Sequence, residues 1–500
     1  MIQRVVRRAT ARRYGRIERY GTNARVVQNE QLEYLLAAGR LTAFGKERSF
    51  GGICSYDEFR RRVDVADYAG FVGYVERARR GERNVLWPGR VRWFAKSSGT
   101  TGRRSKYIPV TAEGVALNHM RGMRDVAAMA TRIFPKADFF AGRMLTLGGS
   151  HSIEREGDTA EVGDLSAILI EHTPRVARMF RRPSRKVALT ADFNRKVEAL
   201  CRECASQNIT ALAGVPSWNL VMLTRLLEYT GRDNISQVWP KLQLFVHGGT
   251  DFRPYREVFR RMIPSQAMNY METYNASEGF FAMADRECAD DMLLMLDYGT
   301  FYEFLPTSSL ADYEKTIPLS EVKCGVEYAM IISNCNGLWR YMIGDTVEFT
   351  SVAPYRIRIT GRTQSFINVF GEELVVDNAE RAVEAACRAT SADVVEYTVA
   401  PVYMGGYHTQ GAHQWLVEFR TMPDSVERWC EALDEQLRQC NSDYDAKRQD
   451  SATLLAPVVT ILPRGTFMRL MALEGRLGGQ NKVPRLRGDR ELADKLLNLK

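Results

Sequence analysis

Short apolar runs alternate with helical patterns between residues 143 and 274, and this alternation limits the fold more than any other feature. Each apolar run ends in glycine, proline or a polar turn. Strands separated by helices favour a parallel sheet, because parallel neighbours need a crossover connection. The sequence therefore predicts an α/β fold with mainly parallel sheets and flanking helices. The predicted strands are residues 143–149, 209–216, 241–249 and 265–274, with helices over residues 193–206 and 218–231 among those between them.

The pattern changes on both sides of this region. The first ninety residues are mainly helical, residues 285–360 are rich in strands and turns, and a fresh α+β pattern begins after Gly361. A chain of 500 residues also exceeds what one hydrophobic core usually serves. We therefore predict a large domain over residues 1–365, which includes a β-rich subdomain, and a small mobile α+β lid domain over residues 366–500.

Cysteine usage and hydropathy indicate a reducing, aqueous compartment. The nine cysteines are scattered and odd in number, which is not a disulfide framework. No stretch reaches the ~18 apolar residues of a spanning helix, and the first residues lack the apolar core of a secretory signal. Cys201 and Cys204 form a lone C-x-x-C without a second pair at zinc spacing, so we expect no metal there. A cytoplasmic protein without a membrane partner is expected.

The net charge of +9 suggests a nucleic-acid partner, because clustered basic residues bind phosphate backbones. The basic residues are dispersed, however, and only 13 of the 69 are lysine. Their densest cluster lies at helical spacing near the start and is either a solvated helix face, which we favour, or an organelle-targeting segment. We therefore expect no nucleic-acid partner. The cluster comprises Arg4, Arg7, Arg8, Arg12, Arg13, Arg16 and Arg19.

The segment "AKSSGTTGRRSKYIPVT", residues 95–111, combines glycines, hydroxyl groups and cations. Gly99 and Gly102 allow a backbone whose amides face an anion, and Lys106 adds a point charge. Arg104 stands where a Walker A loop needs its second glycine, and no Lys-Ser/Thr pair follows. The segment is therefore either a polyphosphate-binding loop of another kind or a strand-to-helix connection rich in capping residues. Its hydroxyl groups belong to Ser97, Ser98, Thr100 and Thr101.

Three distant motifs favour the phosphate-binding interpretation. "YNASEG" places Glu278 just after a predicted strand, close to Tyr274 and Ser277. "GLWRYMIGDTVEF" places Asp345 at a predicted turn, and "GGQNKVPRLRGDR" places Lys482 in a glycine-flanked loop. A carboxylate near phosphates most often holds Mg²⁺, and a carboxylate at a turn can accept hydrogen bonds from ribose hydroxyls. Together with a lysine on a mobile loop, these motifs predict an ATP site with a lid.

The order of these motifs resembles that of the adenylate-forming superfamily of acyl-CoA synthetases, adenylation domains and luciferases. Six segments resemble more specifically the auxin-responsive Gretchen Hagen family of acyl-acid amido synthetases, in particular its bacterial branch. The resemblance runs from about residue 30 to the end of the chain. It implies a monomeric ligase that uses ATP and Mg²⁺ to adenylate a carboxylic acid and then transfers the acyl group to an amine, expected to be an amino acid. The six segments are "WFAKSSGTTG", "VHGGTDFRPY", "YNASEGFF", "LWRYMIGD", "INVFGEEL" and "GGQNKVPRL".

The resemblance also implies roles for individual residues. The phosphate loop would hold the β- and γ-phosphates, Glu278 would hold Mg²⁺, and Asp345 would accept the ribose hydroxyls. Lys482 would stabilise the charge that builds up at the α-phosphate. His247 is equally typical of a structural histidine, and Trp218 of a packing residue. The implied nucleotide contacts are Ser97, Ser98, Gly99, Thr100, Thr101, Gly102, Lys106, Tyr274, Ser277, Asp345 and Arg362, and the implied substrate contacts are Trp218, His247, Gly248, Gly249 and Thr250.

Two departures from the superfamily pattern leave alternatives open. Arg362 is followed by Thr363 and Gln364 where an acidic hinge residue is usual, so the pivot of the small domain is not defined. Lys106 is followed by Tyr107 instead of glycine, which leaves its contact undefined. The alternatives are an acyl-CoA ligase that shares the adenylation step and a non-enzymatic nucleic-acid-binding protein.

Overall fold

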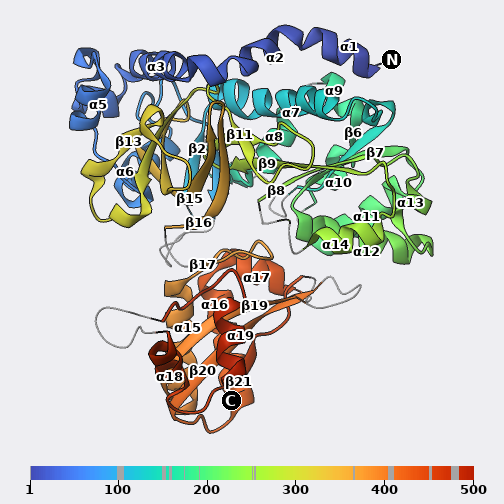
Figure 1. Ribbon diagram of the computed structural model, residues 1–500, viewed down its shortest axis with the longest axis vertical. Helices are drawn as coiled ribbons and strands as arrows, with labels where there is room; N and C mark the ends of the chain where they lie inside the picture. Colours follow the sequence, from blue (N-terminus) through green and yellow to red (C-terminus); the bar gives the residue numbers. More distant parts are fainter. Residues whose placement is uncertain are drawn as a thin grey trace.

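The chain forms a large lobe and a small lobe. In Figure 1 the large lobe lies above the small one. The large lobe ends with β16, and the small lobe begins with β17. The α/β fold with a smaller α+β part, expected from the sequence, is confirmed. The computed structural model describes residues 2–97, 106–148, 154–156, 160–173, 175–190, 192–249, 252, 255–363, 366–403, 410–449, 453–474 and 483–499.

The predicted parallel strands are present and adjacent. Strands β3, β7, β8 and β9 pair in parallel, and the apolar residues of β7 are buried as expected for a sheet covered on both faces. Pro216 starts α12, where its fixed φ suits the first turn, and Gly231 ends the helix with φ +64°. These elements are β3 (Arg143–Thr146), β6 (Arg181–Arg182), β7 (Ile209–Gly214), β8 (Leu244–Gly248), β9 (Asn269–Ala276), α11 (Phe193–Cys204), α12 (Pro216–Thr230), α13 (Ile235–Val238) and α14 (Arg256–Met262).

The β-rich region continues the parallel sheet, which the sequence did not predict. Within the described residues, twelve strands form one sheet in the order β13-β12-β14-β15-β16-β11-β10-β9-β8-β7-β3-β6. Strand β9 joins the two parts, because it is parallel to β8 and antiparallel to β10. The added strands are β10 (Gly279–Met283), β11 (Met292–Leu294), β12 (Thr300–Pro306), β13 (Ile317–Pro318), β14 (Glu327–Asn334), β15 (Tyr341–Val352) and β16 (Tyr355–Arg362), with short helical turns at Thr307–Ser309, Tyr313–Lys315 and Leu319–Glu321.

A second sheet carries the start and the end of the glycine-rich segment. Strand β1 (Trp93–Ser97) pairs antiparallel with β2 (Lys106–Val110), and Ser97 lies opposite Lys106. The segment thus joins two strands, and the alternative of a strand-to-helix connection was wrong. The other strands of this sheet are β4 (Glu154–Glu156) and β5 (Ala160–Gly163), followed by the helices α8 (Leu165–Glu171), α9 (Arg175–Phe180) and α10 (Arg185–Ala188).

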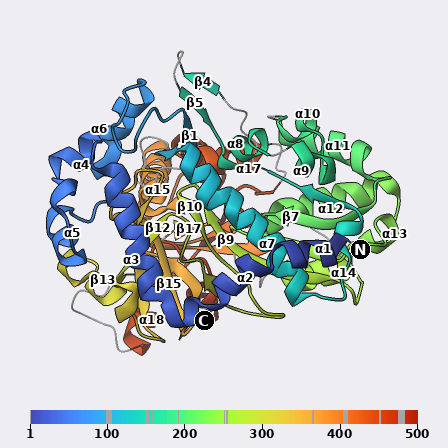
Figure 2. The same cartoon turned by 90° about the horizontal axis from the view of Figure 1, so that it is seen from above.

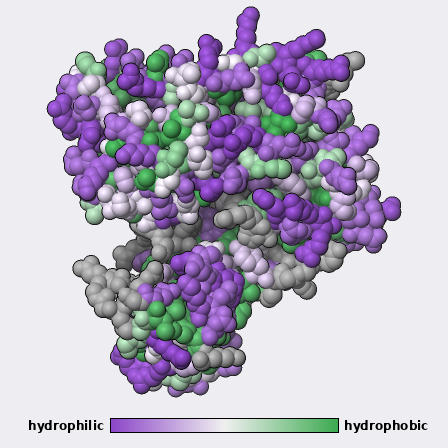
Figure 3. Space-filling model, viewed as in Figure 1, coloured by the Kyte–Doolittle hydropathy of each residue, from purple (hydrophilic) through white to green (hydrophobic). Residues whose placement is uncertain are grey.

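Helices at the start of the chain cross the top of the large lobe beside α7 (Figure 2). The arginines of the predicted cluster are exposed except Arg13, in keeping with the largely hydrophilic outer face in Figure 3. Arg13 donates to Asp125 of α7 (2.8 Å) and to Asp297 (2.7 Å), which fixes α2 on the lobe. The helices are α1 (Ile2–Ala9), α2 (Ala11–Glu18), α3 (Tyr20–Gly39), α4 (Ala43–Glu47), α5 (Tyr56–Arg62), α6 (Tyr68–Arg79) and α7 (Met120–Ile133), with helical turns at Phe50–Gly52, Gly114–His119 and Phe139–Ala141.

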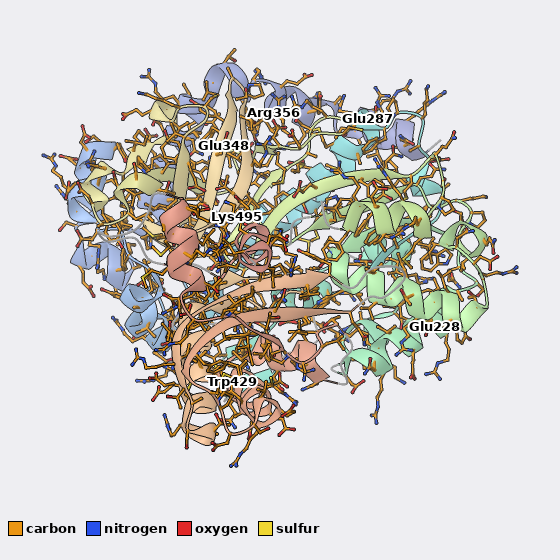
Figure 4. The ribbon with its side chains drawn as sticks, turned by 60° about the horizontal axis from the view of Figure 1, so that its bottom comes forward. Glu228, Glu287, Glu348, Arg356, Trp429 and Lys495 are labelled. Carbon is orange, nitrogen blue, oxygen red and sulfur yellow. The ribbon has the colours of Figure 1, made fainter. Side chains whose placement is uncertain are left out.

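The small lobe packs helices around a three-stranded sheet of order β19-β20-β21. Its core includes Trp429 of α16, whose ring meets Phe419 edge to face at 5.5 Å and whose place in the lobe Figure 4 shows. In the part of the chain that the structure describes, no helix combines the length and apolarity needed to cross a membrane. The elements are β17 (Phe366–Ile367), β18 (Leu374–Val375), α15 (Val376–Thr390), β19 (Asp393–Tyr403), β20 (Gly411–Thr421), α16 (Val426–Cys440), α17 (Ser442–Arg448), β21 (Val458–Ile461), α18 (Thr466–Leu473) and α19 (Glu491–Asn498).

Candidate functional site

The carboxyl ends of the parallel strands face the small lobe. Trp218 follows β7 and contacts Lys447 of the small lobe, and Tyr255 follows β8 and donates to the carbonyl of Val369 at 2.6 Å. Ligands of open α/β sheets bind at this edge, because the loops that follow the strands gather there. The edge therefore marks the candidate site, and the predicted motifs can be located along it.

Glu278 lies in the tight turn between β9 and β10, as predicted, yet it is buried. Its backbone carbonyl accepts hydrogen bonds from the side-chain amides of Asn334 (2.8 Å) and Asn336 (3.2 Å). Asn336 also accepts from the backbone N–H of Thr111, directly after β2, at 3.0 Å. Because buried polar groups that are fully paired hold a fixed geometry, this network fixes the Glu278 turn relative to the strand that carries Lys106.

Lys106 and Glu278 form a buried pair of opposite charges. Burial lowers the pKa of Lys106, and the carboxylate of Glu278 partly opposes this change. Burial also raises the pKa of Glu278, partly opposed by the charge of Lys106. Desolvation disfavours both charged forms more than their attraction favours them. Arg362 lies close enough to affect both pKa values, so a patch of both signs is assembled here.

Asp345 lies within β15, and the prediction of a turn was wrong. Gly344, with φ +99°, sits where the register between β14 and β15 shifts, so the glycine marks a bulge that re-aims the next side chain. The Asp345 carboxylate forms an ion pair with Arg362, whose Nε lies 2.8 Å away, and accepts a hydrogen bond from the Tyr274 hydroxyl at 2.5 Å. A carboxylate has about four acceptor positions, so these partners leave room for ribose hydroxyls.

The Arg362 side chain faces both lobes. It ends β16 opposite Asp345, and its guanidinium lies 4.0 Å from the carboxylate of Glu373 in the small lobe. Burial lowers the pKa of Arg362, but these carboxylates raise it more strongly, so the guanidinium stays charged. The chain passes from β16 into the small lobe directly after this ion pair (Figure 1). Gln364, at the predicted hinge, lies outside the described residues.

The end of β8 approaches β9 unusually closely. A Cβ at Gly248 would lie 2.2 Å from the carbonyl oxygen of Thr273, so only glycine fits. Gly249 has φ +84°, a conformation that favours glycine. The His247 ring is buried and stacks on Phe252 at 4.1 Å, which is the packing expected of a structural histidine. A substrate contact for His247 stays a prediction.

Trp218 lies in the first turn of α12, at the boundary of the lobes. The ammonium of Lys447 sits 3.7 Å from the centre of its ring. This cation–π contact is packing of the kind expected for Trp218, but its partner comes from the other lobe. The expected contact of the Trp218 ring with the acyl substrate stays a prediction.

Several predicted residues lie outside the described part of the chain, and their roles stay predictions. Ser277 is described in the turn beside Glu278, and Ser97 only as the last backbone position of β1. The residues outside are Ser98, Gly99, Thr100, Thr101, Gly102, Thr250 and Lys482.

The two cysteines of the lone C-x-x-C lie on α11. Burial raises the pKa of Cys201 to about 11 and that of Cys204 to about 12, so both thiols are protonated at neutral pH.

Sequence reasoning missed supporting residues whose partners are distant in the chain. Arg340, inside the "LWRYMIGD" motif, forms a buried ion pair with Glu303 at 2.9 Å and anchors the strand that carries Asp345. The sequence motifs did not single out Asn334, Asn336 or Lys447. Only the spacing of asparagines around a glycine, "SNCNG", signalled a structured turn.

The two-lobed fold of this chain matches that of other proteins whose structures have been solved. A solved GH3.15 acyl acid amido synthetase matches with a TM-score of 0.59 and 17% identity over 96% of this chain and 94% of that one. A 2-hydroxyisobutyryl-CoA ligase in its thioesterification state matches with a TM-score of 0.56 and 13% identity. This match covers 95% of the present chain and 92% of the ligase chain. At these identities the matches establish the shared fold.

The chain belongs to the GH3, or Gretchen Hagen, family. The models of the GH3 family N-terminal, central and C-terminal domains match residues 13–268, 293–362 and 377–491. The indole-3-acetic acid-amido synthetase GH3.8 of Oryza sativa subsp. indica is 22% identical and aligns over 94% of this chain and 89% of that protein. The jasmonoyl–L-amino acid synthetase JAR4 of Nicotiana attenuata is 25% identical in an alignment that covers 44% of this chain and 40% of that protein.

Proposed function

We propose that this protein is an acyl-acid amido synthetase. It adenylates a carboxylic acid with ATP, releasing pyrophosphate, and then transfers the acyl group to the amine of an amino acid, releasing AMP. A carboxylate is a poor electrophile at neutral pH, and adenylation gives it a good leaving group. The observation that carries the proposal is the convergence of Glu278, Lys106, Asp345 and Arg362 at the edge where the lobes meet.

The described residues fit a nucleotide bound at this edge. Lys106 stands at the start of β2, directly after the glycine-rich loop. Phosphates bound by this loop would neutralise its ammonium, which supports the assignment of the loop to the β- and γ-phosphates. Asp345, already aimed by Arg362 and Tyr274, would accept the ribose hydroxyls. Glu278 would hold Mg²⁺, which commonly takes one or two carboxylates together with phosphates and water. The bound ion would supply charge neutralisation at the phosphates.

The small lobe would act as a lid that brings Lys482 to the α-phosphate. We place the domain boundary after residue 365, between β16 and β17. The core of the large lobe and the core of the small lobe are built from separate sets of buried residues, which supports movement of one against the other. We further propose a monomer in the cytoplasm, without a nucleic-acid or membrane partner.

The relatives point to small organic acids and amino acids as substrates. The named relatives conjugate indole-3-acetic acid or form jasmonoyl–amino acids. The second candidate is an acyl-CoA ligase, favoured by the shared fold of the 2-hydroxyisobutyryl-CoA ligase. A non-enzymatic nucleic-acid-binding protein would instead show salt-sensitive DNA retention without ATP turnover.

The proposal is tested by ATP–pyrophosphate exchange over a panel of aryl and alkyl carboxylic acids. Each acid that supports exchange is then incubated with mixed amino acids, and the products are analysed by mass spectrometry. We expect acid-dependent exchange and a product whose mass equals acid plus amino acid minus water. Absence of exchange across the panel, with DNA retained at low salt, would contradict the proposal.

A further inference from the structure

The ammonium of Lys447 bridges the lobes. Lys447 belongs to α17, which lies at the end of the small lobe that faces the large lobe (Figure 1). The residue is only 7% exposed, and its ammonium lies 3.7 Å from the centre of the Trp218 ring. A Cβ at Gly371 would come within 3.2 Å of the lysine Cε, so the glycine leaves the room that this side chain uses.

Helix α17 is held firmly, so Lys447 has a defined position. The Tyr444 hydroxyl and the Arg448 guanidinium both donate to Asp434 of α16, at 2.6 and 2.8 Å. Asn441 caps the helix by accepting from the Tyr444 N–H at 2.8 Å, and its amide donates to the carbonyl of Glu372 at 3.0 Å. The helix and the 369–373 turn therefore form one unit around the lysine.

The ammonium has hydrogen-bonding capacity that the described residues do not use. Among them it donates no hydrogen bond and forms no ion pair, although an ammonium carries three donors. Burial lowers the pKa of Lys447 to about 8, although the charges of Asp443, Asp164, Glu372 and Glu373 oppose this change. A buried charge without a hydrogen-bonded partner is costly. This arrangement suits a site that is completed by an anion.

The lysine lies beside the candidate site, on the same edge of the sheet. Trp218 stands just after β7, and a Cβ at Gly249, after β8, would meet Val215 at 3.3 Å. Strand β9, which leads to Glu278, is the next strand along. Neighbouring strands are about 4.8 Å apart, so the ends of β7 and β9 are separated by about 10 Å.

We propose that Lys447 binds the carboxylate of the acceptor amino acid during acyl transfer, while Trp218 holds the ammonium against the large lobe. This inference rests on the proposed function. The carboxylate of the first substrate is consumed when the adenylate forms, so a carboxylate that is recognised afterwards belongs to the acceptor. The small lobe would thus select an amino acid over an amine that lacks a carboxylate.

The test compares acceptors that differ only in the carboxylate. Preformed acyl-adenylate is chased with glycine or glycinamide, and with L-alanine or L-alaninamide, at equal concentrations of neutral amine. We expect the wild-type protein to prefer each acid over its amide by at least ~10-fold in kcat/KM, a barrier difference equivalent to about 1.4 kcal/mol. Lys447→Met should reduce this preference to below ~3-fold, and Lys447→Arg should keep most of it.

Two controls separate binding from folding. Lys495→Met, a change at an exposed lysine of the same lobe labelled in Figure 4, should leave the preference unchanged. The rate of pyrophosphate exchange should stay within ~2-fold of wild type in each variant. If Lys447→Met does not fold, Lys447→Gln replaces it and should show the same loss of preference for the acid over the amide.

The outcomes distinguish the inference from the proposed function. Loss of exchange in the wild-type protein would overturn the function. Normal exchange and amide formation with an unchanged acid preference in Lys447→Met and Lys447→Gln would overturn the role of Lys447. Equal slowing of acid and amide would also overturn it and would leave the lysine as a contact between lobes only.

Discussion

At the scale of single residues, the site combines charges that the fold does not stabilise by itself. Burial shifts Glu278 and Lys106 each towards its neutral form, and their attraction only partly opposes the shift. Such perturbed pairs are typical of functional positions, because the missing stabilisation is supplied by a ligand. Here the ligand would be Mg²⁺ at Glu278 and phosphate at Lys106. Asp345 differs, because Arg362 neutralises its charge and Tyr274 donates a hydrogen bond to it, while acceptor positions stay open for ribose hydroxyls.

Removal of the Glu278 carboxylate should abolish most adenylation. Glu278→Ala should slow acid-dependent pyrophosphate exchange by about 10² or more, because the metal would lose its protein ligand. Glu287→Ala changes an exposed carboxylate a few residues later, labelled in Figure 4, and should leave the rate unchanged. Near-normal exchange in Glu278→Ala would show that this carboxylate does not hold the metal.

The same residue gives a prediction for stability without nucleotide. The folded-state pKa of Glu278 is raised, so the folded protein binds its proton more tightly than the unfolded chain does. The ionised form then costs stability, and the cost appears as pH rises from the ordinary range of a glutamate through the raised pKa. Glu278→Gln should therefore raise the melting temperature relative to wild type, and more at pH 8 than at pH 5. A difference that shrinks with rising pH would contradict the shift.

At the scale of elements, the site depends on how closely β8 and β9 approach. Glycine at position 248 allows the carbonyl of Thr273 to come near. Tyr274 is the next residue of β9, and Glu278 lies in the turn that follows this strand. The bulge at Gly344 does the same for Asp345 on β15. Glycines thus position the charged side chains, although they contribute no charge themselves.

Two glycine substitutions should have opposite effects. Gly248→Ala places a Cβ 2.2 Å from a backbone oxygen, so the strands must separate, and overpacking of this kind costs about 1–3 kcal/mol. Gly15→Ala on α2 meets no atom within 4 Å and gains helix propensity of up to ~1 kcal/mol. Thermal unfolding should show a lower midpoint for Gly248→Ala and an equal or higher one for Gly15→Ala. A tolerated Gly248→Ala would contradict the close approach.

At the scale of the whole molecule, the described contacts between the lobes include small-lobe residues of the 369–373 turn, of α17 and of the end of β19, where Tyr403 meets Tyr255 edge to face. Tyr255 donates to Val369, Lys447 lies over Trp218, and Arg362 approaches Glu373. These are contacts between polar or aromatic side chains, while each lobe has its own hydrophobic core, and an arrangement of this kind allows domains to move. The proposed lid movement would make and break them in each catalytic cycle.

The lid predicts separate effects on binding and chemistry. Lys482→Ala should leave ATP binding largely intact, because the large lobe would hold the proposed nucleotide. It should slow adenylate formation by about 10² or more, the scale of one lost charged contact in the transition state. Equilibrium binding and single-turnover formation of adenylate measure the two quantities. An unchanged rate would identify Lys482 as a surface lysine.

The sequence predicted the local parts of this structure better than its long-range pairings. Strands β7 and β8 were recognisable because their apolar residues are consecutive, and Glu278 because its motif follows such a strand. Asp345 was placed in a turn because glycine in a bulge and glycine in a turn look alike in sequence. The continuous sheet and the contact of Lys447 with Trp218 join distant segments, and no local pattern encodes such pairing.

The choice of acceptor tests the central claim most directly. An amido synthetase and a CoA ligase share the adenylation step, so only the discharge of the adenylate separates them. Preformed adenylate is chased in single turnover with an amino acid or with CoA. The account predicts that the amino acid discharges it at least ~10-fold faster, a difference of about 1.4 kcal/mol in the barrier. Faster discharge by CoA would contradict the account and make the protein an acyl-CoA ligase.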